Sequence, residues 1–181
     1  MAYDFHGSWE SQTGVNAPLR AKQGDPWSLE VAAEHWATRG MPKNKIVIGV
    51  ATYGRGWTLA STANKGLGAP TSGTSQPFQF TQTDGIAAYY EICDVKKAGG
   101  ERFWDDLSQT PYLVKGNQWF TYDDEQSIGA KVDWVIQNGY GGAFTWTLDE
   151  DDFKGEFCGG EKFPLHSLIA KKLGGSAPPS S

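Results

Sequence analysis

The chain lacks several features that would place a protein in a class at once. Its 181 residues contain no run approaching the roughly 20 apolar residues that a transmembrane helix needs. They carry a net charge of −5 and hold no cluster of lysine and arginine, so we expect neither nucleic acid nor membrane as a main partner. The first residues also lack the basic stretch and apolar run of a secretory signal, and export cannot be read from them.

Cysteine is scarce as well, with 2 residues at Cys93 and Cys158. An even count fits either one disulfide formed in an oxidising compartment or two unrelated buried thiols, and composition leaves both open. The sequence has no CxxC motif and no His/Cys spacing suited to zinc. We therefore expect neither a metal nor a cofactor.

Aromatic residues, in contrast, are plentiful, with 8 Trp, 7 Tyr and 9 Phe. Flat, partly polar rings stack on sugar faces, but they are also ordinary core residues. With 39% hydrophobic residues, the chain is predicted to be one soluble globular unit or part of one.

Strands and helices are predicted to alternate along the chain. Apolar stretches predict parallel strands at Met1–Phe5, Lys45–Tyr53 and 141–148. Helices are predicted from Asp25-Pro26 to Gly40, from Asp123 with Gln126 to Gly139, and from Pro164 to Leu173. This order is typical of a (β/α) barrel, although a closed barrel needs eight strands and only three are found.

A long excursion interrupts the alternation. From Ser61 to Phe80 the sequence is rich in Gly, Ser, Thr, Pro and Gln, and it is followed by a predicted helix at 85–97, the strand "RFWDDL" and the hairpin "PYLVKGNQWFTY". We assign residues 58–122 to an α+β insertion, residues 1–57 and 123–174 to a partial TIM barrel, and residues 175–181 to a flexible tail.

Polar and aromatic residues gather after each predicted barrel strand. They are Tyr3, Asp4, His6 and Trp9 after the first, Tyr53, Arg55 and Trp57 after the second, and Trp146, Asp149, Asp151 and Asp152 after the third. Any one of them is more often a cap or core residue than a catalyst, and we expect Asp149–Asp152 to be a solvated cap. Three strand ends that bring rings and charges to one mouth are, however, what a sugar-binding cleft needs.

Five segments carry a resemblance to a known family: "MAYDFHGSW", "ATYGRGWTLA", "AYYEIC", "YDDEQSIGAKVDWVIQNGYGGAFTWTLDEDDF" and "KFPL". In this order they resemble the chitinases of glycoside hydrolase family 18, over nearly the whole chain. The resemblance implies an α/β fold that is the C-terminal portion of a TIM barrel, with strands six to eight and a small α+β insertion domain.

The resemblance also implies a mechanism and roles. In family 18 the substrate's own N-acetyl oxygen attacks the anomeric carbon. By similarity, the Tyr3 hydroxyl binds the N-acetyl carbonyl and Asp4 contacts the distorted sugar. The other implied substrate contacts are Trp146 as the floor under that sugar, Met1 beside it, Tyr53 and Arg55 along the cleft, Glu91 as one wall, and Trp9 on the leaving-group side. Cys93 and Cys158 match positions that are disulfide-linked in related animal enzymes, which also implies secretion.

One family signature is missing from the 181 residues. The pattern Asp-x-x-Asp-x-Asp-x-Glu, whose Glu protonates the glycosidic oxygen, does not occur. We therefore predict part of a chitinase-type hydrolase that contacts chitin or chito-oligosaccharides but does not cleave them alone. The alternatives are a non-catalytic, lectin-like chitin-binding module and a truncated fragment without a function of its own. Unpaired strand edges further predict that the isolated chain aggregates or depends on its small α+β unit and the disulfide.

Overall fold

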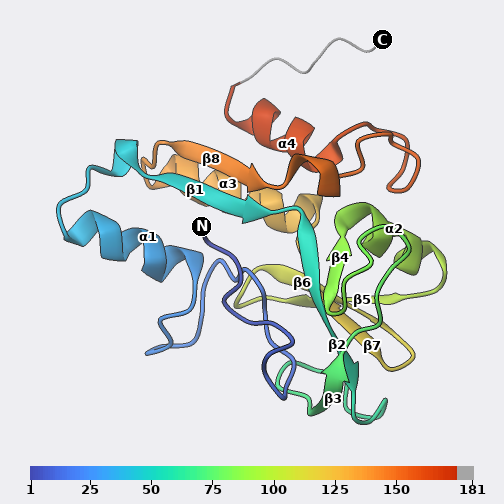
Figure 1. The fold of residues 1–181 in the computed structure, drawn as a ribbon. Coiled ribbons are helices and arrows are strands. Elements are labelled where there is room, and N and C mark those ends of the chain that lie inside the picture. The colour runs from blue at the N-terminus through green and yellow to red at the C-terminus, as the bar shows by residue number, and fades with distance from the viewer. Residues whose placement is uncertain (175–181) are drawn as a thin grey trace.

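The computed structural model describes residues 1–174, and the predicted tail lies outside the described residues. Its strands form two sheets (Figure 1). In the smaller sheet, β1 (Val47–Ala51) and β8 (Gly142–Trp146) pair in parallel. The larger sheet has six strands, β2 (Tyr53–Leu59), β3 (Thr71–Thr74), β4 (Ile86–Ala88), β5 (Glu101–Asp105), β6 (Thr110–Lys115) and β7 (Gln118–Thr121). Their order is β3-β2-β7-β6-β5, with β4 also paired to β2.

The predicted first strand, Met1–Phe5, does not form a regular ladder. The segment lies beside β1, and the amide of Ala2 donates to the carbonyl of Gly49 at 3.3 Å. Asp4 then has a φ of 62°, in the left-handed region, and the amide of Phe5 donates to Asn16 instead of to β1. The strand prediction is therefore wrong, because the backbone turns at Asp4.

The first helix, α1 (Leu29–Thr38), begins later than predicted. Its N-cap is Ser28, whose hydroxyl accepts from the amide of Val31. The predicted cap, Asp25, instead accepts from the amide of Trp27 in a turn before the helix. The predicted stop at Gly40 agrees with the structure, where its φ is 99°.

The helix α3 (Glu125–Gln137) also begins later than predicted. Its N-cap is Asp124, which accepts from the amide of Ser127, and not the predicted Asp123. Asp123 is buried and forms an ion pair with Lys131, which lies two turns into the helix. The Asp123 carboxylate also accepts from the Ser127 hydroxyl in the first turn at 2.7 Å, but the backbone amides of that turn are capped by Asp124.

The predicted helix 85–97 divides into two elements. β4 pairs antiparallel with β2, and α2 (Tyr89–Lys97) follows directly. The larger sheet already begins at Tyr53, before residue 58, where the insertion is expected to start. Two short 3-10 helices, η1 (Lys43–Lys45) and η2 (Leu148–Glu150), and a closing helix, α4 (Pro164–Lys172), complete the fold.

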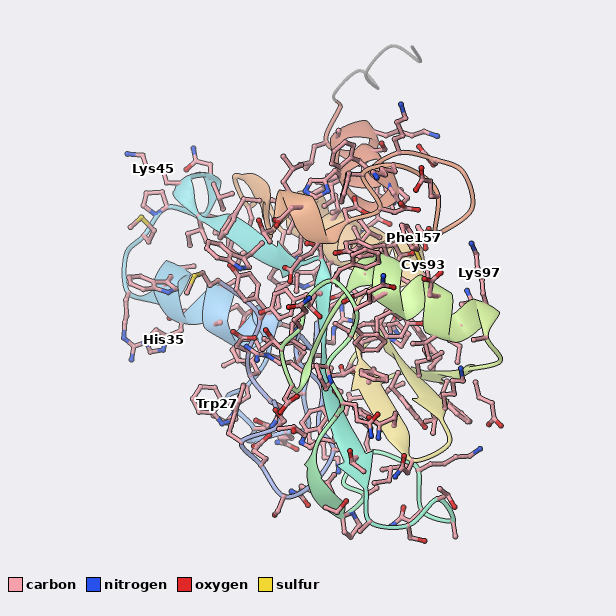
Figure 2. The ribbon with its side chains drawn as sticks, turned by 45° about the vertical axis from the view of Figure 1, so that its right-hand side comes forward. Trp27, His35, Lys45, Cys93, Lys97 and Phe157 are labelled. Carbon is pink, nitrogen blue, oxygen red and sulfur yellow. A yellow bond between two sulfur atoms is a disulfide. The ribbon has the colours of Figure 1, made fainter. Side chains whose placement is uncertain are left out.

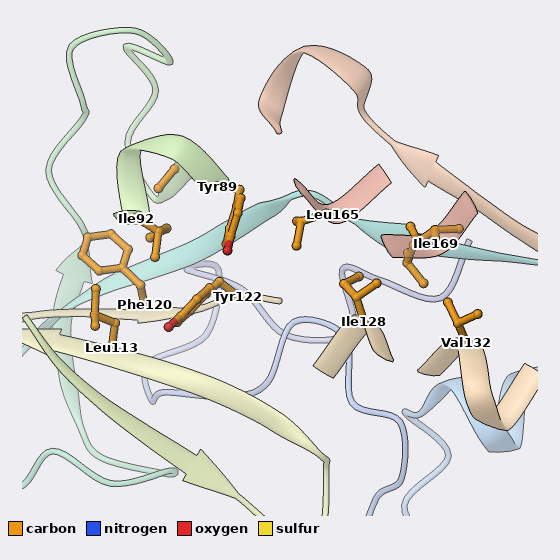
Figure 3. Close-up of a cluster of buried hydrophobic side chains, with 11 residues drawn as sticks. Tyr89, Ile92, Leu113, Phe120, Tyr122, Ile128, Val132, Leu165 and Ile169 are labelled. Atoms are coloured by element: carbon orange, nitrogen blue, oxygen red, sulfur yellow. The ribbon is translucent and has the colours of Figure 1, made fainter. Parts of the chain in front are cut away.

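One hydrophobic cluster joins the two sheets (Figure 3). It contains Val50, Ala87, Tyr89, Ile92, Leu113, Phe120, Tyr122, Ile128, Val132, Leu165 and Ile169. These side chains come from β1, the larger sheet, α2, α3 and α4, so the strands and helices share one core. No helix among residues 1–174 combines the length and apolar character required to cross a membrane.

Candidate functional site

The centre of the candidate site is the carboxylate of Asp4. Its Oδ1 accepts a hydrogen bond from the Tyr53 hydroxyl at 2.5 Å. The Arg55 guanidinium donates to the same oxygen, with Nε at 3.0 Å and Nη2 at 2.8 Å. Tyr53 and Arg55 lie at the start of β2, just after β1 ends, so three predicted site residues meet at the carboxyl end of a parallel strand.

Asn16 holds Asp4 in its unusual backbone conformation. The side-chain oxygen of Asn16 accepts from the backbone amide of Asp4 at 2.8 Å, and the backbone amide of Asn16 donates to the Thr121 hydroxyl of β7 at 3.1 Å. Asn16 is buried. The loop after Asp4 is thereby tied to the larger sheet, which fixes Asp4 relative to Arg55.

Tyr3 brings a hydroxyl to the same place. Its side chain is 8% exposed and packs edge-to-face on Tyr53, with ring centroids 6.0 Å apart. It also lies against Gly49 of β1, where an added Cβ would be 2.6 Å from the Phe144 ring and 3.0 Å from the Tyr3 ring, so β1 needs glycine there. The Tyr3 hydroxyl is buried and has no hydrogen-bond partner within residues 1–174. Burial and the Asp4 carboxylate raise the pKa of Tyr3, so it keeps its proton.

The two predicted stacking tryptophans are both open to solvent, Trp9 at 59% and Trp146 at 58%. The Arg55 guanidinium lies 5.2 Å from the centroid of the Trp9 ring, which joins Trp9 to the Asp4 group. Trp146 ends β8 opposite Ala51 of β1. Met1 is exposed and borders a groove along α1 and β1 whose lining does not include Trp146.

Glu91, the predicted wall, is only 3% exposed. Its Oε1 accepts from the amides of Phe80 at 2.9 Å and Thr81 at 3.2 Å, and its Oε2 accepts from the amide of Ala88 at 3.0 Å. The carboxylate therefore ties the loop before β4 to α2. A contact between Glu91 and substrate remains a prediction.

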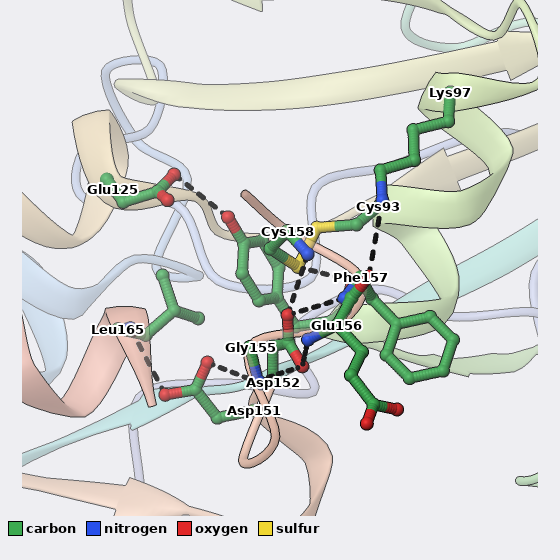
Figure 4. Close-up of a disulfide and its surroundings, with 11 residues drawn as sticks. Cys93, Lys97, Glu125, Asp151, Asp152, Gly155, Glu156, Phe157, Cys158 and Leu165 are labelled. Carbon is green, nitrogen blue, oxygen red and sulfur yellow. Dashed lines mark hydrogen bonds between the residues drawn. A yellow bond between two sulfur atoms is a disulfide. The ribbon is translucent and has the colours of Figure 1, made fainter. Parts of the chain in front are cut away.

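The expectation that Asp149–Asp152 is a solvated cap is wrong for Asp151 and Asp152, which are buried. Asp152 accepts the four amides of residues 155–158 and so shapes the loop after β8 (Figure 4). Asp151 accepts from the amide and ring of His166 and holds the start of α4. These carboxylates are structural because the loop turns its amides toward them.

Sequence reasoning missed Glu150, which lies in η2 directly after β8. Burial, and then the carboxylates of Asp149 and Glu91, raise its pKa to about 7, while Arg55 opposes the rise and Asp4 adds to it. A carboxyl that titrates near neutral pH thus stands beside the candidate site. The signal available in the sequence was the run of four acids after the last strand.

A disulfide confirms the pairing that the family resemblance implied. Cys93 of α2 is bonded to Cys158 in the loop after β8, with the sulfur atoms 2.05 Å apart (Figure 4). It fastens the insertion to the segment that follows the last barrel strand. Among residues 1–174, no group of three or more His, Cys, Asp or Glu side chains is placed to hold a metal ion.

Parallel strands with helices packed on them and a site at their carboxyl ends define part of an α/β barrel, here with an inserted antiparallel sheet. The chain belongs to the glycosyl hydrolases family 18, whose family model matches residues 1–151. It is 48% identical over 185 residues to a probable endochitinase of Caenorhabditis elegans, covering 97% of this chain and 29% of the relative. It is 41% identical over 178 residues to mouse chitotriosidase-1, covering 96% of this chain and 38% of the relative.

Solved structures of chitinases and a pseudo-chitinase are also similar to this chain. The immunomodulatory active chitinase from Trichuris suis matches with a TM-score of 0.94 and 49% identity, over 96% of this chain and 50% of that chain. Human YKL-39, described as a pseudo-chitinase with retained chitooligosaccharide binding, matches with a TM-score of 0.92 and 40% identity, over 96% of this chain and 49% of that chain. The chain spans about half of these structures, which agrees with the predicted C-terminal part of a barrel with its insertion.

Proposed function

We propose that this chain forms the substrate-positioning side of a chitinase-type cleft for β-1,4-linked N-acetylglucosamine polymers. The observation that carries the proposal is the buried, unpartnered Tyr3 hydroxyl beside an Asp4 carboxylate that Tyr53 and Arg55 hold in place. The Tyr3 hydroxyl has almost no exposed surface, so its surroundings have to move slightly before a ligand carbonyl can accept from it. That hydrogen bond would offset the cost of leaving the hydroxyl unpaired.

The proposed mechanism uses the substrate as its own nucleophile. The carbonyl oxygen of the N-acetyl group attacks the anomeric carbon, the bond to the leaving oxygen breaks, and water later opens the resulting oxazolinium ion. Tyr3 donates to the N-acetyl oxygen and orients it. Asp4 places a negative charge beside the positive charge that develops. Trp146 supports the reacting sugar, and Trp9 stacks on the next sugar on the leaving-group side.

The leaving oxygen also has to gain a proton. Asp4 accepts hydrogen bonds from Tyr53 and Arg55, and Glu91 accepts from three amides, so both act as acceptors. The acidic signature of the family is not among the 181 residues. Glu150, whose raised pKa of about 7 lets it hold a proton near neutral pH, lies beside the site but does not belong to that signature. We therefore propose that these residues bind and orient the sugar but do not hydrolyse it by themselves.

A specific observation favours a second candidate function, a non-catalytic chito-oligosaccharide-binding module. Human YKL-39, at 40% identity, is described as a pseudo-chitinase that retains chitooligosaccharide binding. In this reading Tyr3, Asp4, Trp9 and Trp146 hold the sugar, and no chemistry follows.

Calorimetric titration with chitotetraose tests the positioning role. Changing Tyr3→Phe should weaken binding by about fivefold to tenfold, because one buried hydrogen bond is lost. Tyr140→Phe is the matched control, since the Tyr140 hydroxyl is also buried and unpartnered within residues 1–174 but stacks on Trp134 in a hydrophobic cluster that does not include Tyr3. Equal affinities of wild type and Tyr3→Phe would contradict the proposal. No binding by the wild type would favour a fragment without a function of its own.

The disulfide supports a proposal on location. A Cys93–Cys158 bond is stable in oxidising surroundings, which fits a secreted protein. Protein from its native source is alkylated without reduction and analysed by mass spectrometry. Both cysteines should remain unalkylated because they are disulfide-bonded, and alkylated cysteines would contradict secretion.

A further inference from the structure

A second groove, of about 260 Å³, lies along the loop between Asp4 and α1. Its walls come from this loop and from the insertion, and none of Asp4, Tyr53, Arg55 or Trp146 lines it. Trp27 borders the groove and projects from the body of the molecule below α1 (Figure 2). The groove is thus separate from the Asp4 site.

Trp27 presents an exposed aromatic platform at this groove. Its side chain is 54% exposed. Its amide donates to Asp25 at 2.9 Å, and its ring lies 6.1 Å from the ring of Phe5, tilted by 41°. A tryptophan ring offers a large flat contact area to a ligand and has few rotatable bonds to immobilise, which favours binding.

Hydrogen-bonding side chains of both charges surround the platform. His6 is paired with Glu10 at 3.0 Å, and both line the groove. Gln12 and Lys22 also line it, and their side chains make no hydrogen bond within residues 1–174. An exposed ring among mixed donors and acceptors suits a neutral ligand with many hydroxyl and amide groups, which is the chemistry of an N-acetylated sugar.

The groove adjoins the proposed cleft through one tight turn. The amide of Glu10 donates to the carbonyl of Gly7 at 3.0 Å, and Trp9 lies within this turn facing Arg55. His6 and Glu10, on either side of Trp9 in sequence, line the groove. The groove therefore begins at a sequence neighbour of Trp9, the residue that the family resemblance assigns to the leaving-group side.

We infer that the Trp27 groove is an additional subsite for N-acetylglucosamine units that extend beyond Trp9. This inference rests on the proposed function, since it takes the same polymer as ligand. Trp27 stacks on a pyranose face, and Gln12 and Lys22 bind its hydroxyl or acetamido groups. Short oligosaccharides fill the Asp4 cleft alone, whereas long ones reach both places.

Titration with chitotriose and chitohexaose tests the inference. Trp27→Ala should weaken chitohexaose binding about tenfold and leave chitotriose binding unchanged, because only the longer chain reaches the groove. Trp27→Phe should restore most of the loss. Trp36→Ala is the control, since Trp36 is 61% exposed on α1 and does not line the groove.

The outcomes separate the two proposals. Unchanged chitohexaose binding by Trp27→Ala, or equal losses for both lengths, overturns the groove and leaves the cleft standing. If Tyr3→Phe changes the binding of neither ligand while Trp27→Ala weakens chitohexaose binding, the positioning role of Tyr3 fails and the Trp27 groove binds the longer chain without it. No binding of either ligand by the wild type overturns both.

Discussion

Two buried tyrosine hydroxyls show how position decides what a side chain can do. Tyr3 and Tyr140 are both buried and unpartnered within the described residues. Tyr140 stacks on Trp134 with ring centroids 4.9 Å apart, whereas Tyr3 lies beside Asp4 at the end of the parallel strands. The sequence indicated Tyr3 because it precedes Asp4 in a segment that resembles the family. Nothing local in the sequence distinguishes the burial of the two hydroxyls.

Glu150 predicts a pH dependence of stability. Its folded pKa of about 7 lies above the ordinary value of 4.5, so the folded state binds the proton more tightly. Stability from this group is present below about pH 4.5 and is lost as the pH rises to about 7. Glu150→Gln removes the effect, so the variant should gain stability over the wild type between pH 5 and pH 8, on the order of 1 to 3 kcal/mol.

Urea unfolding followed by tryptophan fluorescence at the two pH values measures the difference. The charged and titratable groups facing Glu150 are Asp149, Glu91, Arg55, Asp4 and Tyr90, and all are retained in the variant. Glu161→Gln, at an exposed position, is the control and should show no such gain. A constant difference between wild type and Glu150→Gln across this range would contradict the assignment.

The buried pair of Asp123 and Lys131 predicts a strong asymmetry between single and double variants. Burial raises the pKa of Asp123 and lowers that of Lys131, and each charge is stabilised by the other. Lys131→Met leaves a buried carboxylate without its cation and should reduce the free energy of unfolding by about 3 to 5 kcal/mol. The free energy of unfolding of the double variant Asp123→Leu/Lys131→Met should fall by less than that of Lys131→Met. Denaturant unfolding of all three chains is the measurement, and an additive double variant would contradict the coupling.

At the scale of elements, the sequence correctly predicted the strands, turns and helix ends that depend on local pattern. The apolar run of β1, the hairpin of β6 and β7 around Gly116, and the stop at Gly40 were all predicted correctly. The start of α3 was predicted incorrectly, because Asp123 forms a buried ion pair with Lys131 instead of capping the helix. β4 was predicted as helix, because its pairing with β2 involves residues about thirty positions away that local spacing does not show.

The disulfide joins two elements and predicts a loss of stability on its removal. Cys93 and Cys158 are 65 positions apart, so the bond closes a long loop in the unfolded chain. Cys93→Ser should reduce the free energy of unfolding by about 4 kcal/mol in the chain-entropy description. Cys158→Ser and the double variant should match it, because all three remove the same bond. A loss below about 1 kcal/mol in urea unfolding would show that the bond restrains little.

At the scale of the whole molecule, the smaller sheet has an open side. Within residues 1–174, β8 pairs with no strand other than β1, and Val47, Phe144 and Trp146 are exposed on the two strands. The chain spans only about half of the related solved structures. The sequence predicted this partial barrel from its strand count, but it did not show that one core would join the two sheets.

The open edge predicts self-association of the isolated chain. Unpaired strand edges with exposed apolar side chains favour pairing between copies. Light scattering after size-exclusion chromatography should show a mass that rises with protein concentration, and Phe144→Lys should reduce the rise. A monomer at all concentrations with one sharp thermal transition would contradict this prediction.

The central claim is that these residues position an N-acetylated sugar but do not cleave it. Incubation of the pure 181-residue chain with chitotriose, followed by mass analysis of the sugars, tests it most directly. We predict that chitotriose binds, with affinity lowered by Tyr3→Phe, and stays intact. Release of chitobiose and N-acetylglucosamine by the pure chain would contradict the claim.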